Sequence, residues 1–177
     1  LTPRYSHIGA QRWHHEGLYP SPLEQPAAEE PMVPRIRVLV ADDHRDMLAA
    51  IVSVIEDDDR FAVVATAATA DEAVTLAQGT RVDIALLDVN MPGNGVSAAR
   101  ALADLPRPPV VVAISAQSGG AVVEDMLRAG AVGYVTKGRV GDGLPDLLAR
   151  CADGEVVLAT PSGAGALRAV LGAVQRV

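Results

Sequence analysis

One stretch of the chain reads Ile36-Arg37-Val38-Leu39-Val40-Ala41-Asp42-Asp43, an apolar run that ends in two carboxylates. Its apolar character is nearly continuous, which is typical of a strand covered on both faces of a parallel sheet. The same pattern recurs in three later runs: residues 82–87, 109–114 and 131–136, followed by Asp88, Ser115 and Lys137. The sequence therefore predicts several buried parallel strands, each with a polar residue just past its end.

Segments with helical patterning alternate with these runs. We expect strands at 36–41, 61–65, 82–87, 110–114 and 132–135, and helices at 45–57, 71–78 (with Gly79 as its C-cap), 96–104, 119–129 and 144–152. Five β/α units in succession predict an α/β fold of the flavodoxin-like (βα)5 kind. This is a doubly wound parallel sheet with strand order 2-1-3-4-5.

The two flanks of this region differ from it in composition. Residues 1–34 hold six prolines and no sustained period, so we expect a disordered N-terminal tail; the pair His14-His15 has no second ligand pair at metal-binding spacing. The predicted domain covers residues 35–154. Residues 155–177 predict a short C-terminal tail or helix, too short for a DNA-binding domain, with apolar residues at helical spacing: Leu167, Val170, Leu171 and Val174.

Composition excludes several function classes. The net charge of -7 argues against a broad nucleic-acid surface, which is normally basic. The single cysteine, Cys151, allows no intramolecular disulfide and fits a reducing compartment. No apolar run approaches the roughly 18 residues that span a bilayer, and residues 1–20 lack the layout of a signal peptide. We therefore expect a soluble cytoplasmic protein with neither a nucleic-acid nor a membrane partner.

The polar residues at the strand ends predict a site. Functional groups in an open parallel sheet gather just past the carboxyl ends of the strands. Three carboxylates, from Asp42, Asp43 and Asp88, suit Mg²⁺, while the Ser115 hydroxyl and the Lys137 ammonium suit phosphoryl oxygens. Taken singly, each has an ordinary alternative: a helix N-cap, a turn residue or a surface lysine. Their joint occurrence at successive strand ends favours the site, and a carboxylate neutralised by a metal is a usable nucleophile toward phosphorus.

Four motifs carry a resemblance to a known family. They are Val40-Ala41-Asp42-Asp43-His44, Leu86-Leu87-Asp88-Val89-Asn90-Met91-Pro92-Gly93, Ala113-Ile114-Ser115-Ala116 and Ala129-Gly130-Ala131-Val132-Gly133-Tyr134-Val135-Thr136-Lys137. Over about residues 36–153 the chain resembles the receiver domain of bacterial two-component response regulators, and it is most similar to the NarL/FixJ type. The helix-turn-helix output domain usual in that type is absent from this sequence.

The resemblance implies a phosphorylation site that depends on Mg²⁺. Asp88 would be the phosphoacceptor. Asp43 and Asp88 would bind Mg²⁺ directly, helped by the backbone carbonyl of Asn90, and Asp42 would act through water.

The remaining roles concern the phosphoryl group and signalling. Ser115 and Lys137 would bind phosphoryl oxygens, and Tyr134 would occupy the aromatic switch position. A sensor histidine kinase would be the partner that supplies the phosphoryl group, and homodimerisation is possible. The resemblance thus implies a signalling module that is not an enzyme.

Some features depart from the family pattern and leave alternatives open. The loop Met91-Pro92-Gly93-Asn94-Gly95 is one residue short, and Gly138 follows Lys137 where many receivers have proline. A pseudo-receiver that binds partners without phosphorylation is one alternative. A phosphatase of the haloacid-dehalogenase type is another, although that class needs a second acid where Asn90 stands. A dinucleotide site is disfavoured because no Gly-x-Gly-x-x-Gly follows the first strand.

Overall fold

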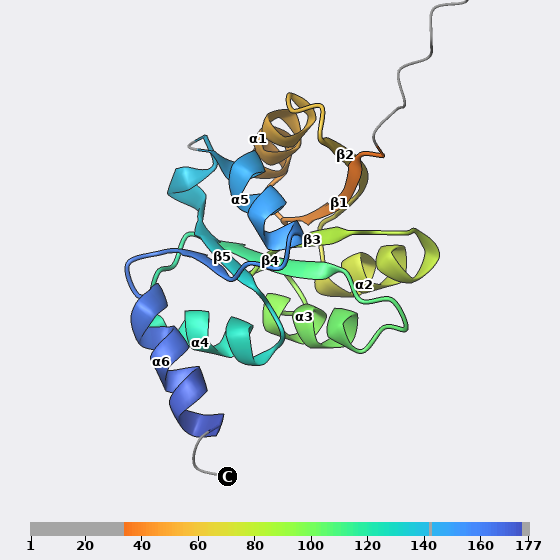
Figure 1. The fold of residues 1–177 in the computed structure, drawn as a ribbon. Helices are drawn as coiled ribbons and strands as arrows, with labels where there is room; N and C mark the ends of the chain where they lie inside the picture. Colours follow the sequence, from red (N-terminus) through yellow and green to blue (C-terminus); the bar gives the residue numbers. More distant parts are fainter. Residues whose placement is uncertain (1–33, 142, 175–177) are drawn as a thin grey trace, which may run out of the picture. The chain divides into compact units, whose positions relative to one another are not determined.

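The computed structural model describes residues 34–141 and 143–174. The predicted disordered tail, residues 1–34, lies outside the described residues apart from Pro34. The pair His14-His15 lies outside them as well. The described part is built on one parallel sheet with helices on both of its faces (Figure 1).

Strands and helices alternate in the predicted order. The elements are β1 (Ile36–Ala41), α1 (Arg45–Glu56), β2 (Phe61–Ala67), α2 (Ala70–Gly79), β3 (Ile84–Asp88), α3 (Gly95–Ala103), β4 (Val110–Ser115), α4 (Gly120–Arg128), β5 (Gly133–Thr136), the short 3-10 helix η1 (Lys137–Arg139) and α5 (Leu144–Ala152). The strand order β2-β1-β3-β4-β5 confirms the predicted order. Each neighbouring pair of strands is parallel.

One predicted helix end is wrong. Gly79 is the last residue of α2 and not its C-cap, and it does not take the left-handed conformation that a capping glycine supplies. Thr80 is the cap, and its amide donates to the Leu76 carbonyl at 2.8 Å. The helix therefore ends by passing into extended backbone at Thr80.

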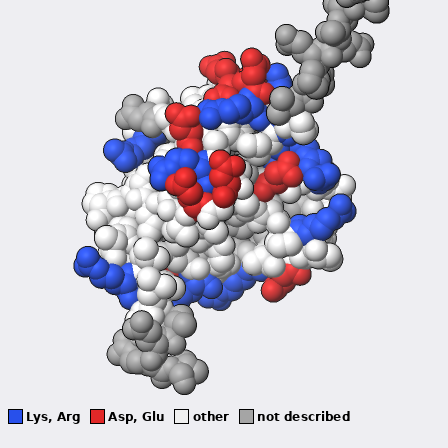
Figure 2. Space-filling model, in the orientation of Figure 1, with Lys and Arg blue, Asp and Glu red and all other residues white. Residues whose placement is uncertain are grey.

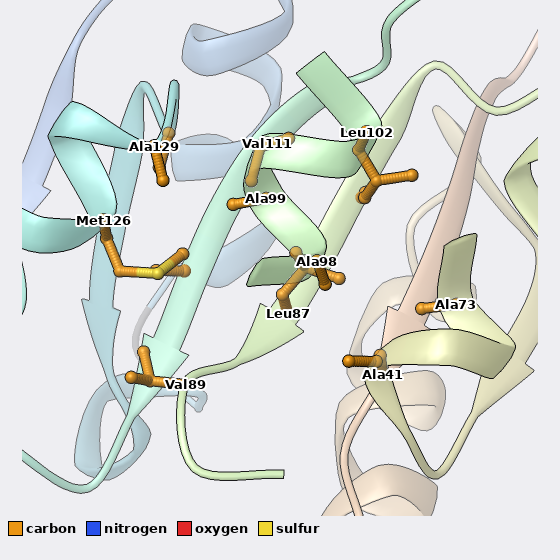
Figure 3. Close-up of a cluster of buried hydrophobic side chains, with 14 of the residues drawn as sticks. Ala41, Ala73, Leu87, Val89, Ala98, Ala99, Leu102, Val111, Met126 and Ala129 are labelled. Carbon is orange, nitrogen blue, oxygen red and sulfur yellow. The ribbon is translucent and has the colours of Figure 1, made fainter. Parts of the chain in front are cut away.

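The core consists of two layers, one on each face of the sheet. Side chains alternate along β1, so that Val38 and Val40 belong to the layer that includes α1 and α5, whereas Leu39 and Ala41 belong to the layer that includes α2, α3 and α4. Figure 3 shows the second layer, where side chains of β3, α3, β4 and α4 meet. Because both layers are buried, each central strand is apolar on both faces, as the continuous runs predict.

The C-terminal segment adds a strand that the sequence analysis did not predict. Strand β6 (Val157–Ala159) pairs in parallel with β5 and extends the order to β2-β1-β3-β4-β5-β6. Helix α6 (Gly163–Val174) then packs along α4 (Figure 1). At three residues, β6 is too short to give a recognisable period, and only its partner β5 defines it.

The helix predicted in this segment is present, but the predicted apolar face is only partly right. Ala166 is buried against the α4 side of the core, and Leu167 and Val170 are half-buried. Leu171 is 56% exposed and therefore lies away from the face of α6 that buries Ala166. The side chain of Val174 lies outside the description.

The surface carries acidic and basic side chains side by side. In Figure 2 red and blue groups lie interleaved over the upper part of the face shown. Several of the described charges form ion pairs, for example Arg60 with Asp58 at 2.6 Å and with Asp146 at 2.7 Å. Among the described helices, none is both long enough and apolar enough to cross a bilayer.

Candidate functional site

The carboxyl ends of β1, β3, β4 and β5 lie at one edge of the sheet and bring the predicted residues together. Asp42 and Asp43 follow β1, Asp88 is the last residue of β3, Ser115 is the last residue of β4, and Lys137 follows β5. We call these five residues the carboxyl-end site. Asp42, Asp88 and Ser115 are the only buried polar or charged side chains among the described residues. This location matches the sheet edge where parallel folds place their functional groups.

Lys137 links two strands across the sheet. Its ammonium lies 2.7 Å from Asp42 Oδ2 and 3.2 Å from Asp88 Oδ2, so the side chain reaches over β4 to β3 and β1. Burial by itself lowers the pKa of Lys137, but the contact with Asp42 and the charge of Asp88 outweigh it and raise the pKa above its usual value. Lys137 is therefore held as a cation, with 13% of its side chain exposed.

The Asp42 carboxylate is engaged at both oxygens. Oδ1 accepts a hydrogen bond of 2.9 Å from the backbone amide of His44, and Oδ2 faces the Lys137 ammonium. The second contact is an ion pair rather than an aligned hydrogen bond. Asp42 is not the N-cap of α1, since His44 occupies that position and makes no capping bond with its side chain. The His44 amide and the Lys137 ammonium thus fix the position of the Asp42 carboxylate.

Asp88 differs from Asp42 at one oxygen. Its Oδ1 is buried and has no hydrogen-bond partner among the residues that the structure describes. Leaving a buried acceptor unsatisfied costs about 1–3 kcal/mol, and more for a charged group. Such an exception in a buried site calls for an explanation, such as strain, a catalytic role, or a bound ion or water.

Asp43 is the accessible member of the acid pair. Its side chain is 32% exposed, and its Oδ1 lies 2.9 Å from His44 Nδ1. One ligand atom from each of Asp42, Asp43, His44 and Asp88 falls within 4.8 Å of the others. Carboxylate oxygens at this spacing fit a hard divalent cation, which needs only one or two of them. Asn90 lies two residues past Asp88 in an exposed turn, and the role of its carbonyl stays a prediction.

Ser115 and Tyr134 adjoin the buried aspartate. Ser115 Oγ accepts a hydrogen bond of 3.1 Å from the Gln117 amide. The Tyr134 ring is fully buried, and its hydroxyl donates to the Gln117 carbonyl at 2.8 Å. Burial is the main cause that raises the pKa of Tyr134; the Ser115 hydroxyl opposes the rise and the charge of Asp88 adds to it. The Ser115 hydroxyl and the Tyr134 hydroxyl therefore share the Gln117 backbone as a hydrogen-bond partner.

Comparison with known proteins agrees with this geometry. Residues 38–148 match the family described as the response regulator receiver domain. The chain belongs to this family.

Individual relatives show how far the likeness extends. The chain is 31% identical over 128 residues to a nitrate/nitrite response regulator homologue of Haemophilus influenzae, covering 72% of this chain and 62% of that protein. It spans about half to three fifths of the length of this and two other response regulators that it matches.

Solved structures give the same picture. The receiver domain of the response regulator NarL from Mycobacterium tuberculosis is 31% identical with a TM-score of 0.66, covering 68% of this chain and 98% of that one. A LuxR-family response regulator from Aurantimonas sp. SI85-9A1 is 28% identical with a TM-score of 0.69, covering 81% and 99%.

The loop after Asp88 closes tightly in this receiver domain. Gly93 and Asn94 both take positive φ, at 87° and 71°. A Cβ on Gly95 would overlap the backbone of Asp88 and Val89, so only glycine fits there. The loop leads directly into α3, with Asn94 Oδ1 accepting from the Val96 amide as the N-cap.

Two groups near the site received no role from sequence reasoning. His44 was visible in the Asp-Asp-His motif, but its position over Asp43 was not predicted. The Gln117 backbone, which binds both Ser115 and Tyr134, carries no sequence signal, because any residue supplies an amide and a carbonyl.

Proposed function

We propose that this receiver domain accepts a phosphoryl group on Asp88 from a phosphohistidine of a sensor histidine kinase. The observation that supports this most directly is the buried, unpartnered Oδ1 of Asp88 beside the Lys137 ammonium. A carboxylate that merely stabilised the fold would have both oxygens paired, as is usual for buried polar atoms.

The chemical step is a displacement at phosphorus. A carboxylate oxygen of Asp88 forms a bond to phosphorus, the bond from phosphorus to the histidine nitrogen breaks, and the electron pair of that bond stays on the imidazole. The product is an acyl phosphate. Lys137 neutralises phosphoryl charge, and the Ser115 hydroxyl binds another oxygen. Catalysis of this kind consists mainly of positioning and charge compensation.

A Mg²⁺ ion fits the same residues. Asp43 and Asp88 would hold it directly with the Asn90 carbonyl, and Asp42 would act through water, since both of its oxygens already have partners in the chain. When bound, the ion neutralises charge that the crowded carboxylates and the incoming phosphoryl group bring together.

Tyr134 would link phosphorylation of Asp88 to a conformational change. The resemblance to receiver domains implies that Tyr134 occupies the aromatic switch position. In this structure the ring is already buried and its hydroxyl is held by Gln117. We infer that phosphorylation changes the hydrogen bonds among Ser115, Gln117 and Tyr134, and so biases the region of α4, β5 and α5.

We further expect a cytoplasmic protein that relays a signal to a partner or to transcriptional control, with a second copy of the chain as one possible partner. A phosphorylation-independent pseudo-receiver remains the second candidate. The shortened loop after Asp88 favours it, whereas the unpartnered Asp88 oxygen favours phosphorylation.

Intact-mass measurement tests the proposal. With Mg²⁺ and acetyl phosphate, the wild-type chain should gain the mass of one phosphoryl group, and hydroxylamine should remove it because an acyl phosphate is cleaved by that reagent. Asp88→Ala should gain nothing. Asp125→Ala, which removes an exposed aspartate on α4, is the matched control and should label like the wild type. Equal labelling of Asp88→Ala would refute the assignment.

A further inference from the structure

We propose that the imidazole of His44 is a nitrogen ligand of the divalent-cation site, which therefore favours first-row transition ions over Mg²⁺. The inference rests on the cation pocket of the proposed function and extends it with a residue outside the oxygen set. It concerns the class of ion that the site takes.

The backbone of His44 is fixed next to the pocket. Its amide donates to Asp42 Oδ1 at 2.9 Å, and the residue is the N-cap from which α1 begins. Asp42 is in turn held by Lys137. The imidazole thus projects from a point that the core of the site defines, although 73% of its side chain is exposed.

The distances around Nδ1 suit shared coordination. Nδ1 lies 2.9 Å from Asp43 Oδ1 and 3.7 Å from Asp42 Oδ1. An octahedral ion with ligands about 2.1 Å away holds adjacent ligand atoms about 3.0 Å apart. The nitrogen and the Asp43 oxygen lie at hydrogen-bond distance here, and this distance is also the spacing of two neighbouring ligands of one ion.

A second observation separates this arrangement from an ordinary surface contact between histidine and aspartate. Asp88 Oδ1 is buried and unpartnered among the described residues, and a ligand atom of Asp88 lies within 4.8 Å of those of Asp42, Asp43 and His44. A surface pair would have no such buried oxygen beside it. The structure thus places a nitrogen donor close to the Asp88 carboxylate, one oxygen of which lacks a hydrogen-bond partner among the described residues.

The donor set decides the metal preference. Carboxylates and carbonyls suit Mg²⁺ and Mn²⁺, whereas imidazole suits ions such as Co²⁺, Ni²⁺ and Zn²⁺. Affinity for a mixed nitrogen and oxygen site rises from Mn²⁺ through Co²⁺ to Ni²⁺. The affinities of a site with His44 as a ligand should therefore follow that order, and removal of the imidazole should reduce the differences in affinity between the ions.

The chain offers a clean background for the test. It has four histidines, of which three precede the described residues: His7, His14 and His15. Their joint replacement by alanine gives a parent protein in which His44 is the sole imidazole. Calorimetric titrations with Mg²⁺, Mn²⁺ and Co²⁺ then compare this parent with the same protein carrying His44→Gln. Pulsed EPR of the Mn²⁺ form detects coupling to a ligated imidazole nitrogen.

The expected result is a parent that binds Co²⁺ more tightly than Mg²⁺ and shows nitrogen coupling. His44→Gln should abolish the coupling and lower the ratio of Co²⁺ to Mg²⁺ affinity by about tenfold, the usual scale for altering a metal's surroundings. An unchanged ratio with no nitrogen coupling in the parent would overturn the inference and leave the phosphorylation proposal standing. A parent that binds none of the three ions would overturn the cation pocket itself.

Discussion

The charged side chains at the two ends of the parallel strands differ in whether all their polar atoms have partners. At the amino end, Arg37 donates three hydrogen bonds of 2.8–2.9 Å to Asp83, from its backbone amide, Nε and Nη2. At the carboxyl end, Asp88 Oδ1 has no partner in the described chain, although Lys137 lies beside Oδ2. The amino end is paired for stability, whereas the carboxyl end keeps an acceptor free at a cost to stability.

The largest effect should come from removing the cation at the carboxyl end. Lys137→Met leaves the buried Asp42 and Asp88 without their counter-charge, and breaking a buried pair in this way costs about 3 kcal/mol. Urea unfolding in EDTA would measure the loss. Arg139→Met, which removes an exposed cation two residues later, should stay within about 0.5 kcal/mol of the wild type. Similar losses in both variants would show that Lys137 is not a structural counter-charge.

Removal of the Arg37–Asp83 pair at the amino end should cause a smaller loss of stability. Asp83→Ala removes the acceptor of all three Arg37 hydrogen bonds, but the Asp83 side chain is 34% exposed and water screens the pair. We expect a destabilisation of about 1 kcal/mol. The same urea assay applies, and a gain in stability would contradict the assignment of this end as purely structural.

Asp88→Asn should stabilise the protein, in contrast to the two variants above. It removes one of three crowded carboxylates while Lys137 keeps Asp42 as its partner at 2.7 Å. We expect a stabilisation of about 0.5 kcal/mol without divalent cation, because relief of like-charge repulsion exceeds the lost contact. Added Mg²⁺ should stabilise the wild type more than the variant. If Asp88→Asn lost as much stability in EDTA as Asp83→Ala does, the proposed difference between the two strand ends would be wrong.

The smallest effect concerns pH at the amino end. Hydrogen bonds from the Arg60 side chain and backbone lower the pKa of Asp58 from 3.8 to about 2. A depressed carboxyl pKa adds stability that is present above pH 3.8 and is lost as the pH falls toward 2. The wild type should therefore lose more stability than Asp58→Asn over that interval in acid unfolding followed by circular dichroism. Parallel curves would show that the pair with Arg60 does not form in solution.

Much of the fold and of the site was predictable because the signals are local. Continuous apolar runs report strands that are buried on both faces, and the residue just past each run falls at one edge of a parallel sheet. That reasoning placed Asp88, Ser115 and Lys137 together. It missed β6, whose three residues become a strand only by pairing with β5. It also placed Leu171 on the apolar face of α6, whereas Leu171 is 56% exposed and Ala166 is the residue buried there.

The sequence by itself determined the order of β1 to β5 with their helices and the residues that gather at the carboxyl ends, since these follow from periodicity and position along the chain. It also indicated the family, through the resemblance carried by four motifs. Only the tertiary structure decided how each charged atom is satisfied. Lys137 reaches across β4 to Asp42 and Asp88, the amide of His44 takes the remaining oxygen of Asp42, and Oδ1 of Asp88 stays without a partner. Pairing of this kind depends on distances between strands far apart in the chain, which no local pattern records.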